Sequence, residues 1–314
     1  MWDATFTLLL EIHRIILMKK LKAQLFLGLT GAFLAVGYSG LLAKEIPIQN
    51  TSNLRKDLLA QSETNPNVNE YLEKNKPESY NALKRQLDIA IEDAKRPSKD
   101  KVVNNLWPLS KSNAQIKWRE NNGKIEYLMA NWKYVKNPNE DWKVGTKKSI
   151  EARTWLTAVP QVKEFCQNCK GIGINIPGNI MLSLRLQQYL GLILNRNSNK
   201  THFIEMWVKA EDLSRPCVDP EINDSSCNAF DISILPSYPV LQDIYTTSYA
   251  AANQEHYPWT ALGYTYDWGN PKKPRAGASE FLIDGTKKKP IEVEVVSIIA
   301  TKEYCNNQYL TVKN

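Results

Sequence analysis

The chain has 314 residues, of which 40 are lysine or arginine and 33 are aspartate or glutamate, so its formal net charge is +7 at neutral pH. Hydrophobic residues make up 43% of the sequence and charged residues 23%. This balance excludes wholesale disorder, a collagen-like repeat and a membrane protein with many spans. The length is enough for one or two domains with a buried core.

The first feature along the chain is a basic segment followed by a long uncharged apolar run. Three lysines lie just after Met18, and the apolar run covers residues 23–43. This order is typical of a secretory signal peptide, with cleavage expected after Ala43, and predicts a secreted or periplasmic protein. A retained membrane anchor is the alternative, because about 20 apolar residues can span a bilayer. Residues 1–43 are therefore assigned to an N-terminal extension and signal peptide, with translation starting at Met1 or at Met18.

Residues 44–105 are predicted to form a helical N-terminal segment and a linker. Between residues 54 and 95, apolar side chains recur at intervals of three and four, which is the period of an amphipathic helix. Pro77 and the acidic residue after it suit the first turn of a helix, and Pro97 ends the pattern. We expect the helix over 78–95 to pack its apolar side against the rest of the protein.

Residues 106–314 are predicted to form a disulfide-stapled, β-rich body. An Asn-Asn-Gly turn at 121–123 favours a hairpin within 116–134. A second amphipathic helix is expected over 182–192, and the stretch 228–254 is expected to be irregular. Further strands are expected over 153–159, 203–208, 261–268, 279–283 and 291–299. The predicted fold class is α+β, a mainly antiparallel β-rich body with a helical N-terminal segment and one further helix.

All five cysteines lie in the C-terminal half, and in an exported protein they are candidates for disulfides. Cys217 and Cys227 flank a short loop rich in turn-forming residues, which predicts a local bridge between them. Cys305 is expected to pair with Cys166 or Cys169, which leaves one thiol over. The Cys166-x-x-Cys169 spacing also suits half a zinc site or a redox dithiol. No second ligand pair completes a zinc site, and the glycines that follow favour a turn.

Two predicted strands carry an acidic residue beside aromatic side chains. Glu205 lies near Trp207, Asp267 precedes Trp268, and Trp259 lies shortly before them. Aromatic rings can cover the faces of a sugar ring while carboxyl groups act on its oxygens. We therefore expect these five residues to form a surface that binds a glycan or a protein partner. The alternative is simple strand alternation, in which Glu205 and Asp267 point outward.

Other functional classes have no motif in the sequence. It contains no Gly-x-Ser-x-Gly elbow, no glycine-rich phosphate loop and no pair of histidines at a zinc-binding spacing. The lysines are spread over the chain, which together with export argues against a nucleic-acid partner. We expect no metal and no cofactor, and membrane contact only through the N-terminal segment if it is not cleaved.

The stretch 277–286 places Glu280 before an apolar run, a glycine-containing turn and a further strand. This arrangement resembles the late catalytic strand of the ADP-ribosyltransferase-like family. The resemblance implies that Arg215 holds NAD and that Tyr264 or Thr265 supports the nicotinamide ribose. It also implies that Glu280 stabilises an oxocarbenium-like transition state. An NAD-using enzyme of this kind is the alternative function, and a solvent-facing position on a strand is the alternative role for Glu280.

Overall fold

The computed structural model describes residues 67–169, 174, 176–195, 199–250 and 255–306. The predicted signal peptide over 1–43 lies outside the described residues. Contacts between residues divide the chain into residues 1–54 and 55–314, and everything described below belongs to the second unit. Within the described part, no helix combines the length and the apolar character that crossing a bilayer requires.

The predicted hairpin is confirmed. Strands β1 (Trp118–Asn121) and β2 (Lys124–Lys133) pair in antiparallel register across a two-residue turn. Asn122 and Gly123 both have a positive φ, 50° and 72°, as a type I′ turn requires at both central positions. On the same edge of β2, the residues from Lys124 to Tyr127 pair with β1, and Met129 and Ala130 pair with β4.

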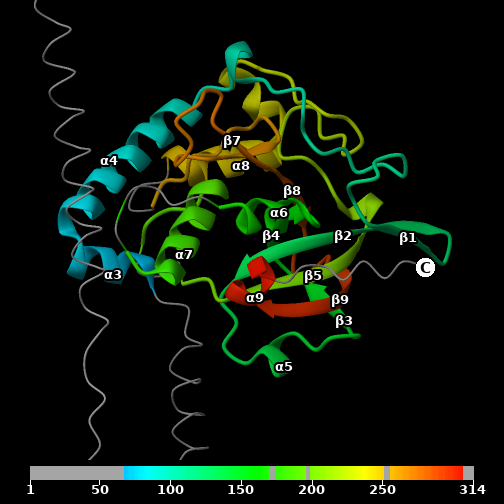
Figure 1. Cartoon of the computed structure of the whole chain (residues 1–314). Helices are drawn as coiled ribbons and strands as arrows, with labels where there is room; N and C mark the ends of the chain where they lie inside the picture. Colours follow the sequence, from blue (N-terminus) through cyan, green and yellow to red (C-terminus); the bar gives the residue numbers. More distant parts are fainter. Residues whose placement is uncertain (1–66, 170–173, 175, 196–198, 251–254, 307–314) are drawn as a thin grey trace, which may run out of the picture. The chain divides into compact units, whose positions relative to one another are not determined.

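The main sheet is antiparallel throughout (Figure 1). Its other strands are β3 (Lys147–Ile150), β4 (Arg153–Ala158), β5 (His202–Lys209), β8 (Phe281–Asp284) and β9 (Ile291–Ala300). The strand order is β3-β9-β5-β2-β4-β8, with β1 paired to β2 beside this path. Two short strands, β6 (Tyr264–Tyr266) and β7 (Ala276–Ser279), form a separate pair. The predicted α+β class with a mainly antiparallel sheet is confirmed.

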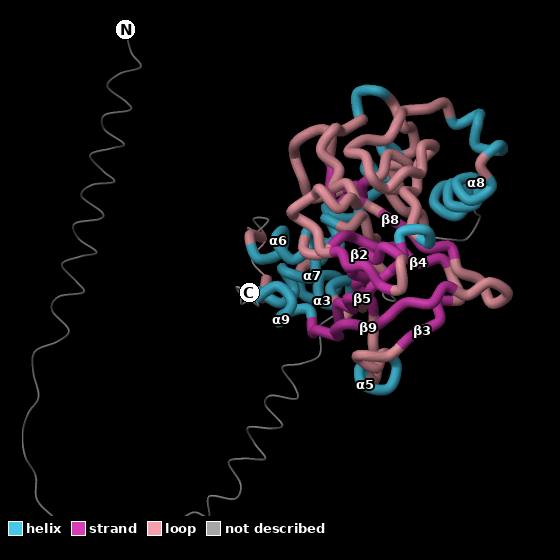
Figure 2. Tube along the Cα trace, turned by 90° about the vertical axis from the view of Figure 1, so that its right-hand side faces the viewer, coloured by secondary structure: helices cyan, strands magenta, loops and turns pink. Residues whose placement is uncertain are grey.

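Helices precede the sheet in the chain and also lie between its strands. They are α3 (Val68–Asn75), α4 (Pro77–Ala94), α5 (Pro138–Asp141), α6 (Gln161–Gln167), α7 (Gly178–Tyr189), α8 (Pro239–Tyr245) and α9 (Thr301–Asn306). Short 3₁₀ turns cover η1 (Lys99–Lys101) and η2 (Ala210–Asp212). Figure 2 shows α6, α7 and α9 grouped together, with α8 apart from them.

The helix predicted over 78–95 is α4, displaced by one residue at each end. Pro77 occupies its first turn. A backbone N–H at this position has no hydrogen-bond acceptor within the helix, so the N–H that proline lacks is not missed. The apolar side of α4 shares one hydrophobic cluster with residues from α3, α7 and β6. This cluster contains Val68, Leu72, Leu83, Leu87, Ala90, Ala94, Ile180, Leu184, Tyr266 and Trp268. The predicted packing of this helix against the rest of the protein is confirmed.

The expectation that 228–254 is irregular was wrong for the described part of that stretch. A 3₁₀ helix η3 (Ile232–Ser237), then α8, then a π-helical turn η4 (Thr246–Ala250) follow one another there. Each element is too short to show helical periodicity, and Pro236 and Pro239 interrupt the pattern. A π-helical turn is rare and frequently occurs at functional sites.

Two disulfides confirm the expected pairings. Cys217 and Cys227 are bridged across 10 residues, and Cys166 is bridged to Cys305 across 139 residues. The second bridge joins α6 to α9, and Cys169 is the free thiol. Burial raises the pKa of the Cys169 thiol to about 11, which is the opposite of what a catalytic dithiol requires.

Candidate functional site

A cavity of about 520 Å³ borders β2 and β4, between the sheet and the segment that contains α8 and η4. Small-molecule sites typically have volumes of roughly 300–1,000 Å³ and mix aromatic walls with a few polar groups. Side chains that line this cavity include Asn131, Trp155, Thr157, Ser248 and Trp259. Residues far apart in the sequence therefore build one compartment large enough for a small ligand.

Glu280 is the only carboxylate among the described residues that line the cavity. It occupies the single position between β7 and β8, where its backbone N–H donates to the carbonyl of Gly263 over 2.9 Å. Protein surrounds the carboxyl group, and no described group forms a hydrogen bond with Oε2. The residue is nevertheless only half-buried, which is consistent with its lining the cavity. Burial raises the pKa of Glu280 to about 8, so the neutral acid predominates at pH 7.

Trp259 supplies a second polar atom without a partner at the same cavity. Its indole Nε1 is shielded from solvent, and no described group accepts a hydrogen bond from it. The backbone of this residue is held by two contacts. Tyr249 Oη donates a hydrogen bond to its carbonyl, and the residue forms an isolated antiparallel β-bridge with Thr265. Buried polar side-chain atoms are bonded in the large majority of cases. Both residues line the same cavity, but protein covers the two unbonded atoms themselves.

Three cationic side chains, Lys133, Arg153 and Lys200, are among the described residues that line the cavity. Arg153 donates through Nε to Asp284 Oδ1 over 2.8 Å and through Nη1 to Asp243 Oδ2 over 2.7 Å. The Lys133 ammonium lies 4.7 Å from the centroid of the Trp142 ring, in cation–π geometry. Neither group forms an ion pair with the carboxyl group of Glu280, which agrees with the high pKa of that acid.

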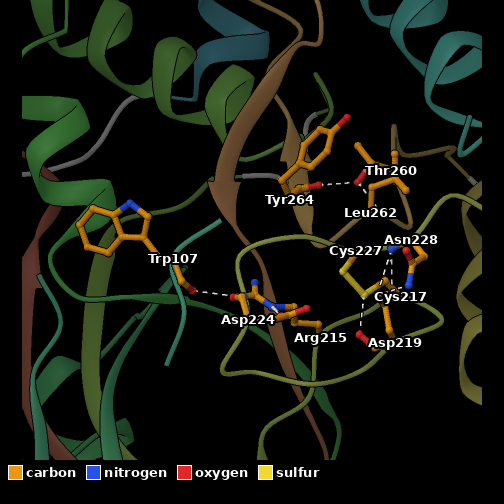
Figure 3. The surroundings of a disulfide bond; sticks show 10 residues. All are labelled: Trp107, Arg215, Cys217, Asp219, Asp224, Cys227, Asn228, Thr260, Leu262 and Tyr264. Carbon is orange, nitrogen blue, oxygen red and sulfur yellow. Dashed lines mark hydrogen bonds and ion pairs between the residues drawn. A yellow bond between two sulfur atoms is a disulfide. The ribbon is translucent and has the colours of Figure 1, made fainter. Parts of the chain in front are cut away.

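The NAD-holding role inferred for Arg215 does not match its surroundings (Figure 3). The side chain is 1% exposed and is absent from the cavity lining. Its Nη2 donates to the carbonyls of Trp107 and Asp224 over 2.8 and 2.9 Å, and its Nε lies 3.3 Å from Asp224 Oδ1. The guanidinium carbon also lies 4.6 Å from the ring centroid of Phe281. Arg215 therefore fixes the loop that the Cys217–Cys227 bridge closes.

Of the other residues of the inferred NAD site, two line the cavity and Tyr264 does not. Thr265 and Glu280 both line it. The Thr265 hydroxyl donates to the carbonyl of Tyr189 over 2.6 Å and accepts from the Ala278 N–H over 2.8 Å. The Tyr264 hydroxyl donates to the carbonyl of Lys101. Thr265 and Glu280 thus line one cavity, whereas Arg215 is not among its lining residues.

The acidic–aromatic pair Asp267 and Trp268 is part of the packed interior. Asp267 accepts two hydrogen bonds from the Arg185 guanidinium, at 2.9 and 2.6 Å, and is 3% exposed. Trp268 is 2% exposed and donates through Nε1 to the carbonyl of Leu192 over 2.9 Å. Trp268 also borders a second cavity, of about 430 Å³ beside α4, whose described lining contains no carboxylate. These contacts account for both residues without a ligand.

Glu205 and Trp207 lie on β5 and are also held by protein contacts. Glu205 is buried and accepts a hydrogen bond from Ser297 Oγ over 3.0 Å. Strand alternation alone predicted that Glu205 points outward, and its burial shows that it does not. Trp207 is half-buried, with the Arg119 guanidinium carbon 4.8 Å from its ring centroid. Of the five residues proposed to bind a glycan, Trp259 alone lines the 520 Å³ cavity.

Sequence reasoning missed several residues of the cavity. Trp155 belongs to a predicted strand, where an aromatic side chain is unremarkable, and Ser248 lies in the stretch expected to be irregular. No local pattern marks either residue as a ligand contact. Their proximity depends on how β4 and η4 pack, which periodicity does not encode.

Among the described residues, one group of three side chains has the spacing of a metal site: Cys217, Asp219 and Cys227. Both sulfur atoms form the disulfide, so neither is a thiolate ligand. Asp219 is also engaged, because Oδ2 accepts from the side-chain amide of Asn228 over 2.9 Å (Figure 3). This cluster is a stapled loop rather than a metal centre.

Comparison of the chain with protein-family models, with curated proteins and with solved structures finds no match.

Proposed function

We propose that this is an exported binding protein that holds a saccharide in the 520 Å³ cavity. The observation that carries this proposal is a cavity of small-molecule size whose lining combines the aromatic residues Trp155, Tyr257 and Trp259 with polar side chains. Aromatic rings provide flat apolar surface for the C–H face of a sugar ring, and the polar atoms meet its oxygens. Asn131, Thr157 and Ser248 add neutral hydrogen-bonding groups to the same lining.

Binding is favoured over sugar hydrolysis because of the number of carboxyl groups. Glycoside hydrolysis generally uses two of them, one on each side of the scissile bond. Glu280 is the only one among the described residues of the cavity lining. Asp243 and Asp284 lie near Arg153 but form ion pairs with it and do not line the cavity.

Export is supported by the leader-like sequence and by the two disulfides, which form and persist in oxidising compartments. It is tested by expressing the full chain in a bacterium with a periplasm and alkylating the thiols without reduction. We expect N-terminal sequencing to find a mature chain that begins after Ala43, with alkylation at Cys169 alone. A full-length cytosolic product with five alkylated cysteines would refute export.

Saccharide binding is tested by tryptophan fluorescence and calorimetry with methyl glycosides of glucose, galactose, mannose and N-acetylglucosamine. We expect at least one of them to quench the wild-type emission. Trp259→Phe should weaken its binding about tenfold, because the smaller ring removes part of the aromatic wall. Trp207→Phe is the matched control, since Trp207 lies on β5 outside the cavity lining. Equal losses in both variants, or no binding by the wild type, would refute the assignment.

An NAD-using enzyme is the second candidate, because Thr265 and Glu280 border the same cavity. The resemblance to ADP-ribosyltransferase-like folds implies that a hydroxyl supports the nicotinamide ribose and that a glutamate stabilises the transition state. The position of Arg215 weighs against it, since that guanidinium is bound inside the protein. Incubation with NAD separates the candidates: the enzyme releases nicotinamide, and Glu280→Gln abolishes the release. No release from the wild type removes this candidate.

A further inference from the structure

The described residues that line the 520 Å³ cavity carry more positive than negative charge. Lys133, Arg153 and Lys200 line it, whereas Glu280 is the only carboxylate among the described lining residues. Arg153 forms ion pairs with two carboxylates that lie outside the lining. The two lysines are therefore the cations that matter most for the charge of a ligand.

The three cations lie at one end of the main sheet because of how its strands run. Strand β2 ends at Lys133, and its neighbour β5 begins at His202, two residues after Lys200. These strands are antiparallel, so Lys133 lies opposite His202, and the Thr201 N–H donates to the Lys133 carbonyl over 3.0 Å. On the other edge of β2, the antiparallel strand β4 begins at Arg153. Each of three adjacent strands thus has a cation at or next to this end of the sheet.

The positive charge at this end of the sheet is not offset by the ring against which Lys133 packs. The ammonium lies 4.7 Å from the centroid of the Trp142 ring, which attracts a cation but carries no net charge. Burial lowers the pKa of Lys133, and the positive charges of Lys200 and Lys148 lower it further, while the attraction of Asp141 is smaller. Like charges held near one another repel, and an anion beside them would relieve that repulsion.

A ligand in the cavity can reach the lysines and the aromatic wall together. Lys133 and Lys200 are half-buried rather than enclosed, Trp155 is half-buried, and Tyr257 is exposed. A saccharide with an acidic group offers the matching chemistry. Its oxyanion accepts charge-assisted hydrogen bonds from an ammonium, and the C–H face of its ring packs on aromatic surface.

We propose that the ligand of this cavity is an acidic saccharide whose oxyanion pairs with Lys133 and Lys200, and this inference rests on the saccharide-binding function proposed above. A uronate carboxylate, a sulfate ester and a phosphate ester share this chemistry. A neutral sugar keeps the aromatic contact and the hydrogen bonds but gains no ion pair, and the lysines repel an amino sugar. Affinity should therefore fall from the acidic to the neutral to the amino form of the same sugar.

The test compares sugars that differ in one group, by calorimetry on the wild-type protein. The probes are methyl glucoside with methyl glucuronide, methyl galactoside with methyl galacturonide, and glucose with its 6-sulfate, its 6-phosphate and glucosamine. At least one acid should bind about tenfold more tightly than its neutral parent. This gain should shrink when the salt concentration rises from about 0.05 M to about 0.5 M. The acid with the largest gain identifies the anionic group.

Two variants and a matched control test which side chains read the charge. Lys133→Gln and Lys200→Gln should each weaken binding of that acid about tenfold and leave its neutral parent within about twofold. Lys288→Gln is the control, because Lys288 is exposed, lies outside the cavity lining and loses the same charge. It should bind both sugars as the wild type does.

The results that would overturn this inference differ from those that would overturn the proposed function. Neutral sugars that bind the wild type as tightly as their acidic forms would leave saccharide binding intact but remove the charge selection. An equal loss of acid affinity in Lys288→Gln would remove the assignment to the two lysines. Absence of binding by every probe would refute both proposals. The ranking of sugars by the wild type is decisive even if a variant fails to fold, which circular dichroism reports.

Discussion

Replacement of Glu280 by glutamine should stabilise the protein at neutral pH, and this gain should depend on pH. The carboxyl group is surrounded by protein, forms no ion pair, and has a pKa that burial raises to about 8. In the unfolded chain the same group titrates near 4.5. Between these two values the folded protein keeps a proton that the unfolded chain releases. Each rise in pH across that window therefore favours unfolding.

The magnitude follows from the displacement of the pKa. One pKa unit corresponds to about 1.4 kcal/mol, so the wild type loses about 3 kcal/mol between pH 4.5 and pH 7. The loss approaches about 5 kcal/mol above about pH 9 and then stops, because the group is ionised in both states there. Glutamine has no proton to release. The difference in unfolding free energy between the variant and the wild type should therefore grow by about 4 kcal/mol from pH 5 to pH 8.

Urea unfolding of both proteins at pH 5, 6, 7 and 8 measures this difference directly. Contributions from all other titrating groups cancel when the two curves are subtracted. Glu221→Gln is the matched control: its side chain is exposed, and the variant should follow the wild type within about 0.5 kcal/mol throughout. A constant offset between the Glu280→Gln and wild-type curves over this range would refute the account of the buried acid.

Three further predictions concern the contacts that hold the fold. Arg215→Met should lower the unfolding free energy by about 3 kcal/mol, because two carbonyls lose their donor, and an unchanged urea midpoint would contradict the structural role. Asp267→Asn should cost about 3 kcal/mol by leaving a buried guanidinium without its counter-charge, while saccharide affinity stays within twofold of the wild type. Loss of a bridge should cost about 3 kcal/mol in Cys227→Ser and about 5 kcal/mol in Cys305→Ser, since the loops closed contain 10 and 139 residues. Calorimetric melting that ranks these two variants in the opposite order would contradict the loop-entropy argument.

Local signals in the sequence were sufficient for several parts of the fold. The hairpin followed from the Asn-Asn-Gly turn, because few residues other than asparagine and glycine accept a positive φ at two successive positions. The α4 helix followed from its proline start and its apolar period. The bridge between Cys217 and Cys227 followed from their short, turn-rich loop. In each case the determining interaction lies within a few residues of the chain.

The candidate site depends on distant parts of the chain, and local signals located it only partly. Trp259 was selected for being aromatic and Glu280 for a family resemblance, yet what joins them is a shared cavity. Asp267 has the same acidic–aromatic neighbourhood in sequence as a binding residue, but Arg185 from α7 neutralises it. Asp267 forms an ion pair with Arg185, whereas no ion pair is found for Glu280 among the described residues. The residues next to them in the sequence do not specify this difference.

The bridge between α6 and α9 has a consequence for how the chain must mature. During synthesis Cys166 and Cys169 emerge almost together, whereas Cys305 follows 139 residues after Cys166. The nearer thiol is thus the first available partner, yet the finished protein joins Cys166 to the later one. Once the fold closes, burial keeps the Cys169 thiol protonated at neutral pH, and a thiol attacks a disulfide only as its thiolate. Tertiary structure therefore selects the partner of Cys166 over its neighbour in sequence and then protects that pairing from exchange.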